Sequence, residues 1–153
     1  MRRTATILAA MALMVVFSSG VALAAFEYSI TGTDRIDILS GTRLAEQISG
    51  LGGADQINGG GGADLIEGGQ GADELGDGLG KDTVYGRSGA DNMIGQGGDP
   101  AVDQFKGGSG NDTVQSMDIP AVGDAVACGP GTDTVYADEA DTVKVDCERV
   151  KTP

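Results

Sequence analysis

The chain has 153 residues and a formal net charge of −13, with 27 glycines, three Phe, three Tyr, no Trp and no His. An acidic chain of this kind is unsuited to nucleic acid or to anionic membrane surfaces, and it favours divalent cations as partners. The absence of histidine excludes a Ser-His-Asp triad and any histidine general base, so we predict that the chain is not an enzyme.

The first 24 residues have the organisation of a secretory signal peptide. Basic residues 2–3 precede an apolar run at 7–17, and a small-residue cleavage motif follows at 22–24. The apolar run is too short to span a bilayer comfortably, which makes an uncleaved membrane anchor the weaker alternative. We therefore predict cleavage after Ala24 and export. Residues 25–153 would then form one secreted, extracellular domain that is not inserted in a membrane.

A nine-residue repeat fills the middle of the chain. Each unit has glycines among its first four positions, Asp at position six and an apolar residue at position eight. A short fixed period of this kind predicts a solenoid. The units are GLGGADQIN (50–58), GGGGADLIE (59–67), GGQGADELG (68–76), DGLGKDTVY (77–85) and GRSGADNMI (86–94), joined later by GGSGNDTVQ (107–115) and CGPGTDTVY (128–136).

The register of position six continues beyond the clear units. Carboxylates recur every nine residues, with two longer intervals and one shorter one near the C-terminus, and an apolar residue follows each of them two places later. The apolar residues are Leu39, Ile48, Ile57, Ile66, Leu75, Val84, Met93, Phe105, Val114, Val126, Val135 and Val143.

This register predicts an all-β fold, a right-handed parallel β-roll with 18 residues per turn. Each unit divides into a six-residue turn and a three-residue strand, in which position eight points inward because side chains alternate across a strand. Two units complete one turn, so the carboxylates alternate between two edges. The first edge carries Asp37, Asp55, Asp73, Asp91, Asp112 and Asp133, and the second carries Glu46, Asp64, Asp82, Asp103, Asp124 and Asp141. Two three-residue insertions, around 99–101 and within 116–123, fall in loops of the second edge.

Two cysteines, Cys128 and Cys147, lie near the C-terminus. In an exported protein they predict one disulfide, which would tie residues 128–153 into a cap and close a loop of about 20 residues. Their spacing excludes a C-x-x-C redox site, and the lack of histidine disfavours zinc.

The stacked acidic edges predict a bound cation. One apolar residue per unit makes a thin core, and the carboxylates of each edge repel one another. Calcium accepts six to eight oxygen ligands, which Asp side chains and the carbonyls of glycine-rich turns can supply, whereas magnesium demands a tighter octahedral shell. We therefore predict that the chain is largely disordered without calcium and folds when calcium binds.

The units GGGGADLIE, GGQGADELG and GGSGNDTVQ resemble the RTX (hemolysin-type) calcium-binding repeats of exported bacterial proteins, over roughly residues 32–144. The resemblance implies a parallel β-roll with calcium between successive turns, held by Asp carboxylates and turn carbonyls. The Asp103 and Asp124 turns are lengthened, and the turn before Glu46 lacks the glycine pattern. The implied ligands are Asp55, Asp64, Asp73, Asp82, Asp91, Asp103, Asp112, Asp124 and Asp133, with Gly59, Gly68, Gly71, Gly107 and Gly110.

The sequence thus favours a secreted, non-enzymatic calcium-binding β-roll that folds on meeting external calcium. It departs from many RTX proteins, which leave through a type I channel on a C-terminal signal, because its predicted signal is N-terminal. A calcium-dependent adhesion, matrix or cell-surface structural protein, with an unknown surface partner, remains open as an alternative.

Overall fold

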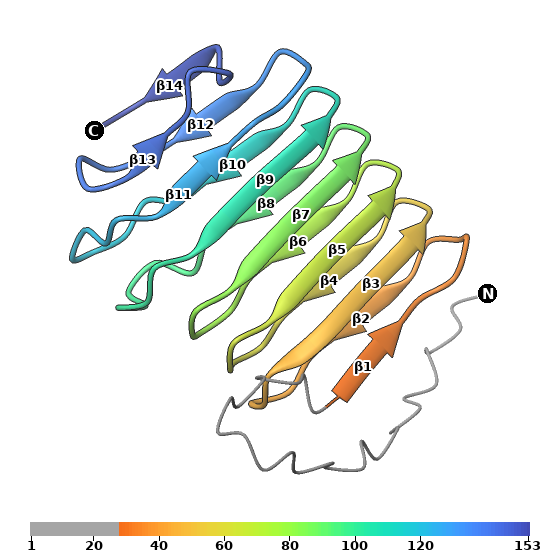
Figure 1. Ribbon diagram of the computed structural model, residues 1–153. Helices are drawn as coiled ribbons and strands as arrows, with labels where there is room; N and C mark the ends of the chain where they lie inside the picture. The colour runs from red at the N-terminus through yellow and green to blue at the C-terminus, as the bar shows by residue number, and fades with distance from the viewer. Residues whose placement is uncertain (1–27) are drawn as a thin grey trace, which may run out of the picture.

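Short parallel strands stack into two facing sheets over residues 28–153, the part of the chain that the computed structural model describes (Figure 1). The predicted signal peptide and its cleavage point lie outside these residues. Within the described part, no helix is long and apolar enough to cross a membrane. Sheet A contains β1 (Tyr28–Thr31), β3 (Glu46–Gly52), β5 (Leu65–Gln70), β7 (Thr83–Ser88), β9 (Gln104–Ser109), β11 (Ala125–Ala127) and β13 (Thr142–Val143). Sheet B contains β2 (Ile38–Ser40), β4 (Gln56–Asn58), β6 (Glu74–Gly76), β8 (Asn92–Ile94), β10 (Thr113–Gln115), β12 (Thr134–Tyr136) and β14 (Arg149–Lys151).

The register confirms the predicted β-solenoid. The chain passes alternately between the sheets, so that every strand pairs in parallel with the strand one full turn later. Ile48 lies opposite Ile66 in the regular part, which gives the expected spacing of 18 residues. Val84 lies opposite Phe105, a spacing of 21, because the first insertion lengthens that turn. The solenoid therefore absorbs insertions in its loops without shifting the inward positions.

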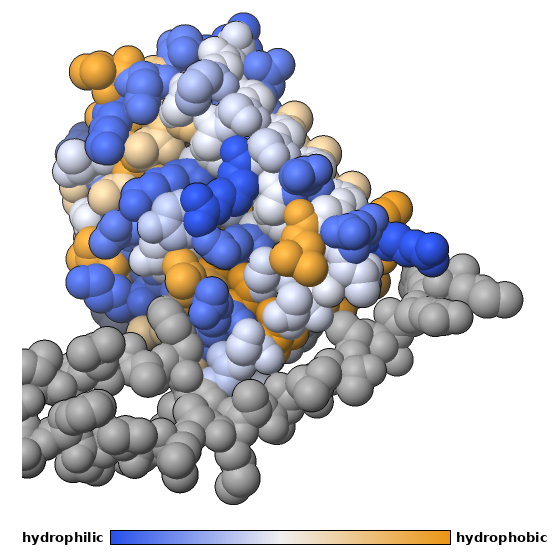
Figure 2. All heavy atoms as spheres, turned by 45° about the vertical axis from the view of Figure 1, so that its right-hand side comes forward, coloured by the Kyte–Doolittle hydropathy of each residue, from blue (hydrophilic) through white to orange (hydrophobic). Residues whose placement is uncertain are grey.

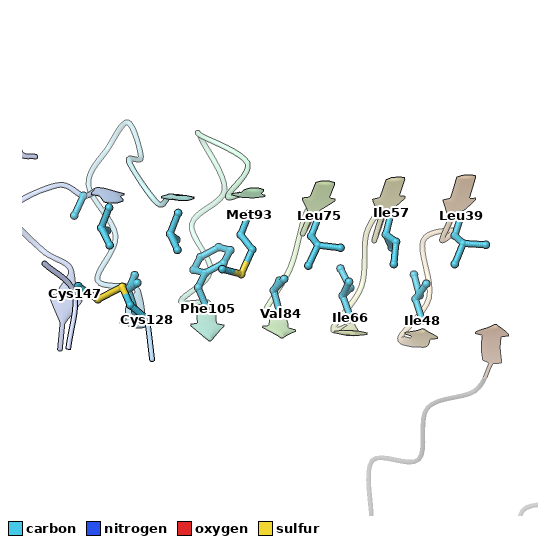
Figure 3. Packing of buried hydrophobic residues seen from close by; sticks show 14 of the residues in the cluster. Leu39, Ile48, Ile57, Ile66, Leu75, Val84, Met93, Phe105, Cys128 and Cys147 are labelled. Carbon is cyan, nitrogen blue, oxygen red and sulfur yellow. A yellow bond between two sulfur atoms is a disulfide. The ribbon is translucent and has the colours of Figure 1, made fainter. Parts of the chain in front are cut away.

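A single apolar column fills the space between the sheets. Figure 3 shows Leu39 and Ile57 of sheet B facing Ile48 and Ile66 of sheet A, with Phe105 and Met93 further along. Eleven of the twelve predicted inward residues are buried, and Val143 is only partly buried because it lies in the last strand of sheet A. Ile30 extends the column at one end, and Cys128, Ala137 and Cys147 extend it at the other.

The predicted division into a six-residue turn and a three-residue strand is correct for most of sheet B and wrong for most of sheet A. Strand β3 has seven residues, and β5, β7 and β9 have six each. These strands continue past position nine. The backbone of successive first-edge turns has the same conformation at position two, where Leu51 and Arg87 have φ of 75° and 80°. Leu51 stays paired with Gly69, and Gly69 with Arg87, so the ladder runs into the turn.

Both insertions lie where the register placed them. Residues 95–103 join β8 to β9 and residues 116–124 join β10 to β11, so both loops approach sheet A along the second edge. The tail after β13 adds one more rung to sheet B, since Val150 of β14 pairs with Val135. The predicted disulfide between Cys128 and Cys147 is present, with a Cα–Cα distance of 5.2 Å.

The outer surface is largely hydrophilic. Figure 2 shows one face on which polar residues predominate and hydrophobic residues occur in separate places. On sheet A, Arg87 forms an ion pair with Glu67, and the Lys106 amine lies 4.7 Å from the centre of the Tyr85 ring. Exposed pairs of this kind add little to stability, so the core and the edges dominate the energetics.

Candidate metal centre

A ladder of carboxylates runs along each edge of the solenoid. One oxygen of each carboxylate (Oδ1) accepts a hydrogen bond from the backbone N–H of the acidic residue one turn earlier. On the first edge, the N–H of Asp55 donates to Asp73 and that of Asp73 donates to Asp91, at 2.8 and 2.9 Å. On the second edge, the N–H of Asp64 donates to Asp82 at 2.7 Å. The same bond links Asp37 to Asp55, Asp91 to Asp112, Asp112 to Asp133, Glu46 to Asp64, Asp82 to Asp103, Asp103 to Asp124 and Asp124 to Asp141.

The second oxygen (Oδ2) of most of these carboxylates has no protein partner. Within residues 28–153, this oxygen is buried and accepts no hydrogen bond in Asp55, Asp64, Asp73, Asp82, Asp91, Asp112 and Asp133. A buried acceptor without a partner costs free energy, and a buried charge costs more unless a counter-charge offsets it. These seven oxygens therefore mark positions where a cation fits the residues present.

Glycine at position one keeps the space open beside the free oxygens of Asp55, Asp64, Asp73, Asp91 and Asp112. A Cβ at Gly68 would lie 2.5 Å from Asp73 Oδ2 and 3.0 Å from the carbonyl oxygen of Gly86 in the next turn. A Cβ at Gly59 would likewise lie 2.9 Å from Asp64 Oδ2. A free carboxylate oxygen and a backbone carbonyl from successive turns thus approach the same point. Carboxylate and carbonyl oxygens are the donors that calcium prefers.

Glycine at position four has a different role, because it turns the backbone. Gly71 and Gly110 have φ of 135° and 138°, a region that side chains rarely adopt. A Cβ at Gly71 would overlap the carbonyl oxygen of Gly53 in the preceding turn. The structure thus places Gly59, Gly68 and Gly107 beside free Asp oxygens, and Gly71 and Gly110 in the tightly stacked bends.

Burial and mutual repulsion make the ionised ladders unfavourable without a counter-ion. Burial raises the pKa of Asp55 to about 6, and the neighbouring charges of Asp73 and Asp37 add to the shift. Burial also raises the pKa of Asp64 and of Asp91 to about 6. On the second edge the pKa of Asp124 rises to about 7 and that of Asp82 to about 8, with burial again the largest cause. A bound divalent cation would reverse these shifts.

The carboxylates of the lengthened turns and of the ends differ from the rest. Asp103 and Asp124 are buried and keep their ladder bonds, but they do not share the buried, unpartnered oxygen of the regular turns. Glu46 turns back on its own loop and accepts hydrogen bonds from the N–H and hydroxyl of Thr42. Asp141 accepts hydrogen bonds from Ser116 and from the N–H of Asp138.

Two acidic residues outside the predicted set also belong to the edges. Glu148 ends the first ladder, because its carboxylate accepts the N–H of Asp133 at 2.8 Å. The signal for it was present, since Val150 follows it two places later as in every other unit. Asp77 is fully buried with a free Oδ2, and its carboxylate gathers with those of Asp82 and Asp103. Asp77 stands at position one of its unit, where the regular units have glycine, and this difference is visible in the sequence.

The fold and the site together define a class of repeat protein. It is a solenoid with glycine-rich turns, and its stacked carboxylates are suited to bind metal ions. A family model described as the RTX calcium-binding nonapeptide repeat matches the chain in four copies, over residues 40–75, 77–101 and 97–116. The chain therefore belongs to the RTX calcium-binding repeat family. No curated protein and no solved structure matches it significantly. Together, the repeat family and the clustered buried Asp residues suggest calcium binding.

Proposed function

We propose that this protein is a secreted calcium-binding β-roll that folds when calcium binds between its stacked turns. The observation that carries the proposal is the row of buried Asp oxygens without partners, most of them beside the open space of a glycine. The proposed ligands are the carboxylates of Asp55, Asp64, Asp73, Asp82, Asp91, Asp103, Asp112, Asp124 and Asp133, with turn carbonyls at Gly59, Gly68, Gly71, Gly107 and Gly110.

Coupling between folding and binding follows from the electrostatics of the ladders. Without a cation, the folded chain must either protonate the buried Asp residues or keep like charges close together. Calcium removes this cost only in the folded state, since the ladder sites need carboxylates that lie a full turn apart in sequence. Binding free energy is then folding free energy.

Circular dichroism of the purified chain, titrated with calcium and separately with magnesium, tests this coupling. We expect a coil-to-β transition in calcium and little change in magnesium, which keeps its waters and needs a stricter geometry. A chain that is already β-structured in chelator would contradict folding on binding. A chain that neither folds nor takes up calcium would overturn the proposed function.

A charge-matched pair of variants separates the ladder from acidity in general. Asp55→Asn, Asp73→Asn and Asp91→Asn together remove three charges from the first-edge ladder. The control makes three changes at exposed acids, Asp34→Asn, Glu74→Gln and Glu139→Gln. We expect the ladder variant to lose most of its calcium response and the control to keep it. Equal responses would mean that overall charge, not the ladder, binds the ion.

Export is proposed on separate grounds. It is supported by the basic, apolar and small-residue pattern of residues 1–24 and by the disulfide, a bond that persists mainly in oxidising compartments. Mass spectrometry of protein recovered from the culture medium should find Ala25 at the N-terminus and Cys128 bonded to Cys147. Protein found only inside the cell, with its first residues intact, would contradict export.

We also propose that the protein has no catalytic activity of its own. The chain contains no histidine, and the ladder hydrogen bonds already engage its buried repeat carboxylates.

A further inference from the structure

Asp77 departs from the repeat at position one, where it adds a fully buried carboxylate to the second edge. Position one is glycine in the turns before and after it, at Gly59 and Gly95. Elsewhere this position faces the free oxygen of the Asp five residues later, as Gly59 faces Asp64. In the unit 77–85 a carboxylate stands there instead, beside Asp82.

The Asp77 carboxylate is held in place at one oxygen and free at the other. Its Oδ1 accepts hydrogen bonds from the N–H of Gly78 at 2.6 Å and from the N–H of Gln96, in the next turn, at 2.9 Å. Its Oδ2 accepts none within the described chain and is buried. Two backbone donors thus fix the orientation of a side chain that leaves one oxygen unpartnered.

Three carboxylates from two successive turns meet at this point. One oxygen each from Asp77, Asp82 and Asp103 lies within 4.8 Å of the other two, and all three residues are buried. Asp82 also has a free Oδ2, while its N–H donates to Asp103 at 2.7 Å. Two unpartnered oxygens and a third carboxylate therefore share one small volume, a donor set suited to a hard divalent cation.

The apolar surroundings of the cluster strengthen the repulsion among its carboxylates, which favours a bound cation. A Cβ at Gly95 would lie 3.2 Å from the Phe105 ring and 3.5 Å from Asp77 Oδ2, so the carboxylate lies next to the apolar column. Charges interact more strongly where water is excluded. Burial, followed by the charge of Asp103, raises the pKa of Asp77 to about 7.

We propose that Asp77, Asp82 and Asp103 form a three-carboxylate calcium site that is tighter than the repeat sites and is the first to fill. This inference rests on the proposed calcium function and deepens it at one turn. Calcium affinity rises with the number of charged ligands, and this site has one carboxylate more than the repeat provides. The ion bound here would fasten the turns on either side of the first insertion.

The test compares the unaltered full chain with Asp77→Gly and with the control Glu74→Gln. Asp77→Gly restores the glycine found in the neighbouring turns. Asp77 does not have a positive φ, so the change to glycine relieves no backbone strain that would affect the comparison. Glu74 is exposed, so the control removes one surface charge from the same unit. Competition with a calcium chelator of known affinity gives the first association constant, and circular dichroism in saturating calcium checks that each chain folds.

We expect Asp77→Gly to lower the first association constant about tenfold or more, and Glu74→Gln to leave it within about twofold. In chelator we expect Asp77→Gly to show no less β-structure than the unaltered chain, because the change removes a buried repulsion from the calcium-free fold. An unchanged first constant in Asp77→Gly would overturn this site and leave the repeat sites standing. An unaltered chain that takes up no calcium would instead overturn the proposed function itself.

A second variant keeps the test decisive if Asp77→Gly does not fold in calcium. Asp77→Asn retains an oxygen acceptor for the N–H groups of Gly78 and Gln96, and it removes only the charge. Asp77→Asn should also lower the first calcium association constant. Full retention of that constant in a folded Asp77→Asn chain would contradict the proposal.

Discussion

The first edge of the solenoid repeats one turn with little change, whereas the second edge departs from it repeatedly. The first edge has Asp at every ladder position from Asp37 to Asp133 and ends on Glu148, and its turns up to Asp133 all keep the flanking inward residues nine apart. The second edge contains Glu46, Asp77 and both insertions. Both nevertheless keep the N–H to carboxylate ladder, which shows that position six and the inward position eight are common to the two edges while turn length and position one vary.

Position one offers the sharpest contrast between the edges. On the first edge the departure from glycine is Cys128, whose side chain forms the disulfide with Cys147. On the second edge one departure is Asp77, whose side chain brings a carboxylate. The same backbone position thus provides a covalent link at one place and a charge at another, because in both cases the Cβ points into the solenoid.

Substitution of a first-edge glycine should have the largest effect. Gly71→Ala forces a side chain into a positive φ and into the backbone of the preceding turn, and we expect a loss of at least about 3 kcal/mol. Gly61→Ala on the second edge meets nothing closer than 3.6 Å and should cost less than about 0.5 kcal/mol. Urea unfolding in saturating calcium measures both. Similar losses of unfolding free energy in the two variants would mean that Gly71 and Gly61 tolerate a side chain equally well, which would contradict this prediction.

Loss of the disulfide should affect the C-terminal end of the stack. Replacing Cys128 and Cys147 by Ser should cost about 3 kcal/mol, as estimated for a closed loop of this length. Since each turn of a solenoid contacts only its neighbours, the loss should be concentrated in β12, β13 and β14. Hydrogen exchange would locate it. Protection lost equally in β3 and β5 would contradict this and indicate a fully cooperative fold.

A single ladder substitution should distinguish a regular turn from a lengthened one. Asp73 on the first edge has a buried, unpartnered oxygen, and Asp124 on the second edge lacks this feature. We expect Asp73→Asn to raise the calcium concentration at half-folding about threefold to tenfold, and Asp124→Asn to raise it less. In both variants the Asn oxygen keeps the ladder hydrogen bond. The reverse order, measured by circular dichroism during calcium titration, would place the stronger repeat sites on the second edge.

Acidification should have the smallest effect, and its sign should depend on calcium. Folded-state pKa values of about 6 for Asp55 and about 8 for Asp82 lie above 3.8, the ordinary pKa of an aspartate side chain. Between about pH 4 and pH 8 the calcium-free folded state therefore binds more protons than the unfolded chain, so lowering the pH through this window stabilises it. In calcium the sign reverses, because protons compete for the ligands.

Circular dichroism recorded from pH 8 to pH 5, with and without calcium, tests both directions through the content of β-structure. The second edge should protonate first in the calcium-free protein, since Asp82 and Asp124 have the higher pKa values. A calcium-free chain that loses β-structure as the pH falls would contradict the raised pKa values of the ladder carboxylates.

Most of the architecture could be predicted because it depends on local spacing. The interval from Asp64 to Ile66 fixes which side chain points inward, and the interval from Asp64 to Asp73 assigns neighbouring units to opposite edges. The length of the sheet A strands could not be predicted this way. It depends on whether the backbone hydrogen bonds continue around the first edge, and non-glycine residues at positive φ, Leu51 and Arg87, take part there.

Spacing along the chain therefore determined the solenoid, its two acidic edges, the inward column and the residues that could hold calcium, because each follows from a short interval that repeats. Only the tertiary structure decided which carboxylate oxygens are left without partners, how Glu148 closes the first ladder, and that Asp77 lies against Asp82 and Asp103. The physical reason is that these contacts join residues about one full turn apart, or depend on burial by neighbouring turns. They exist only after the turns have stacked.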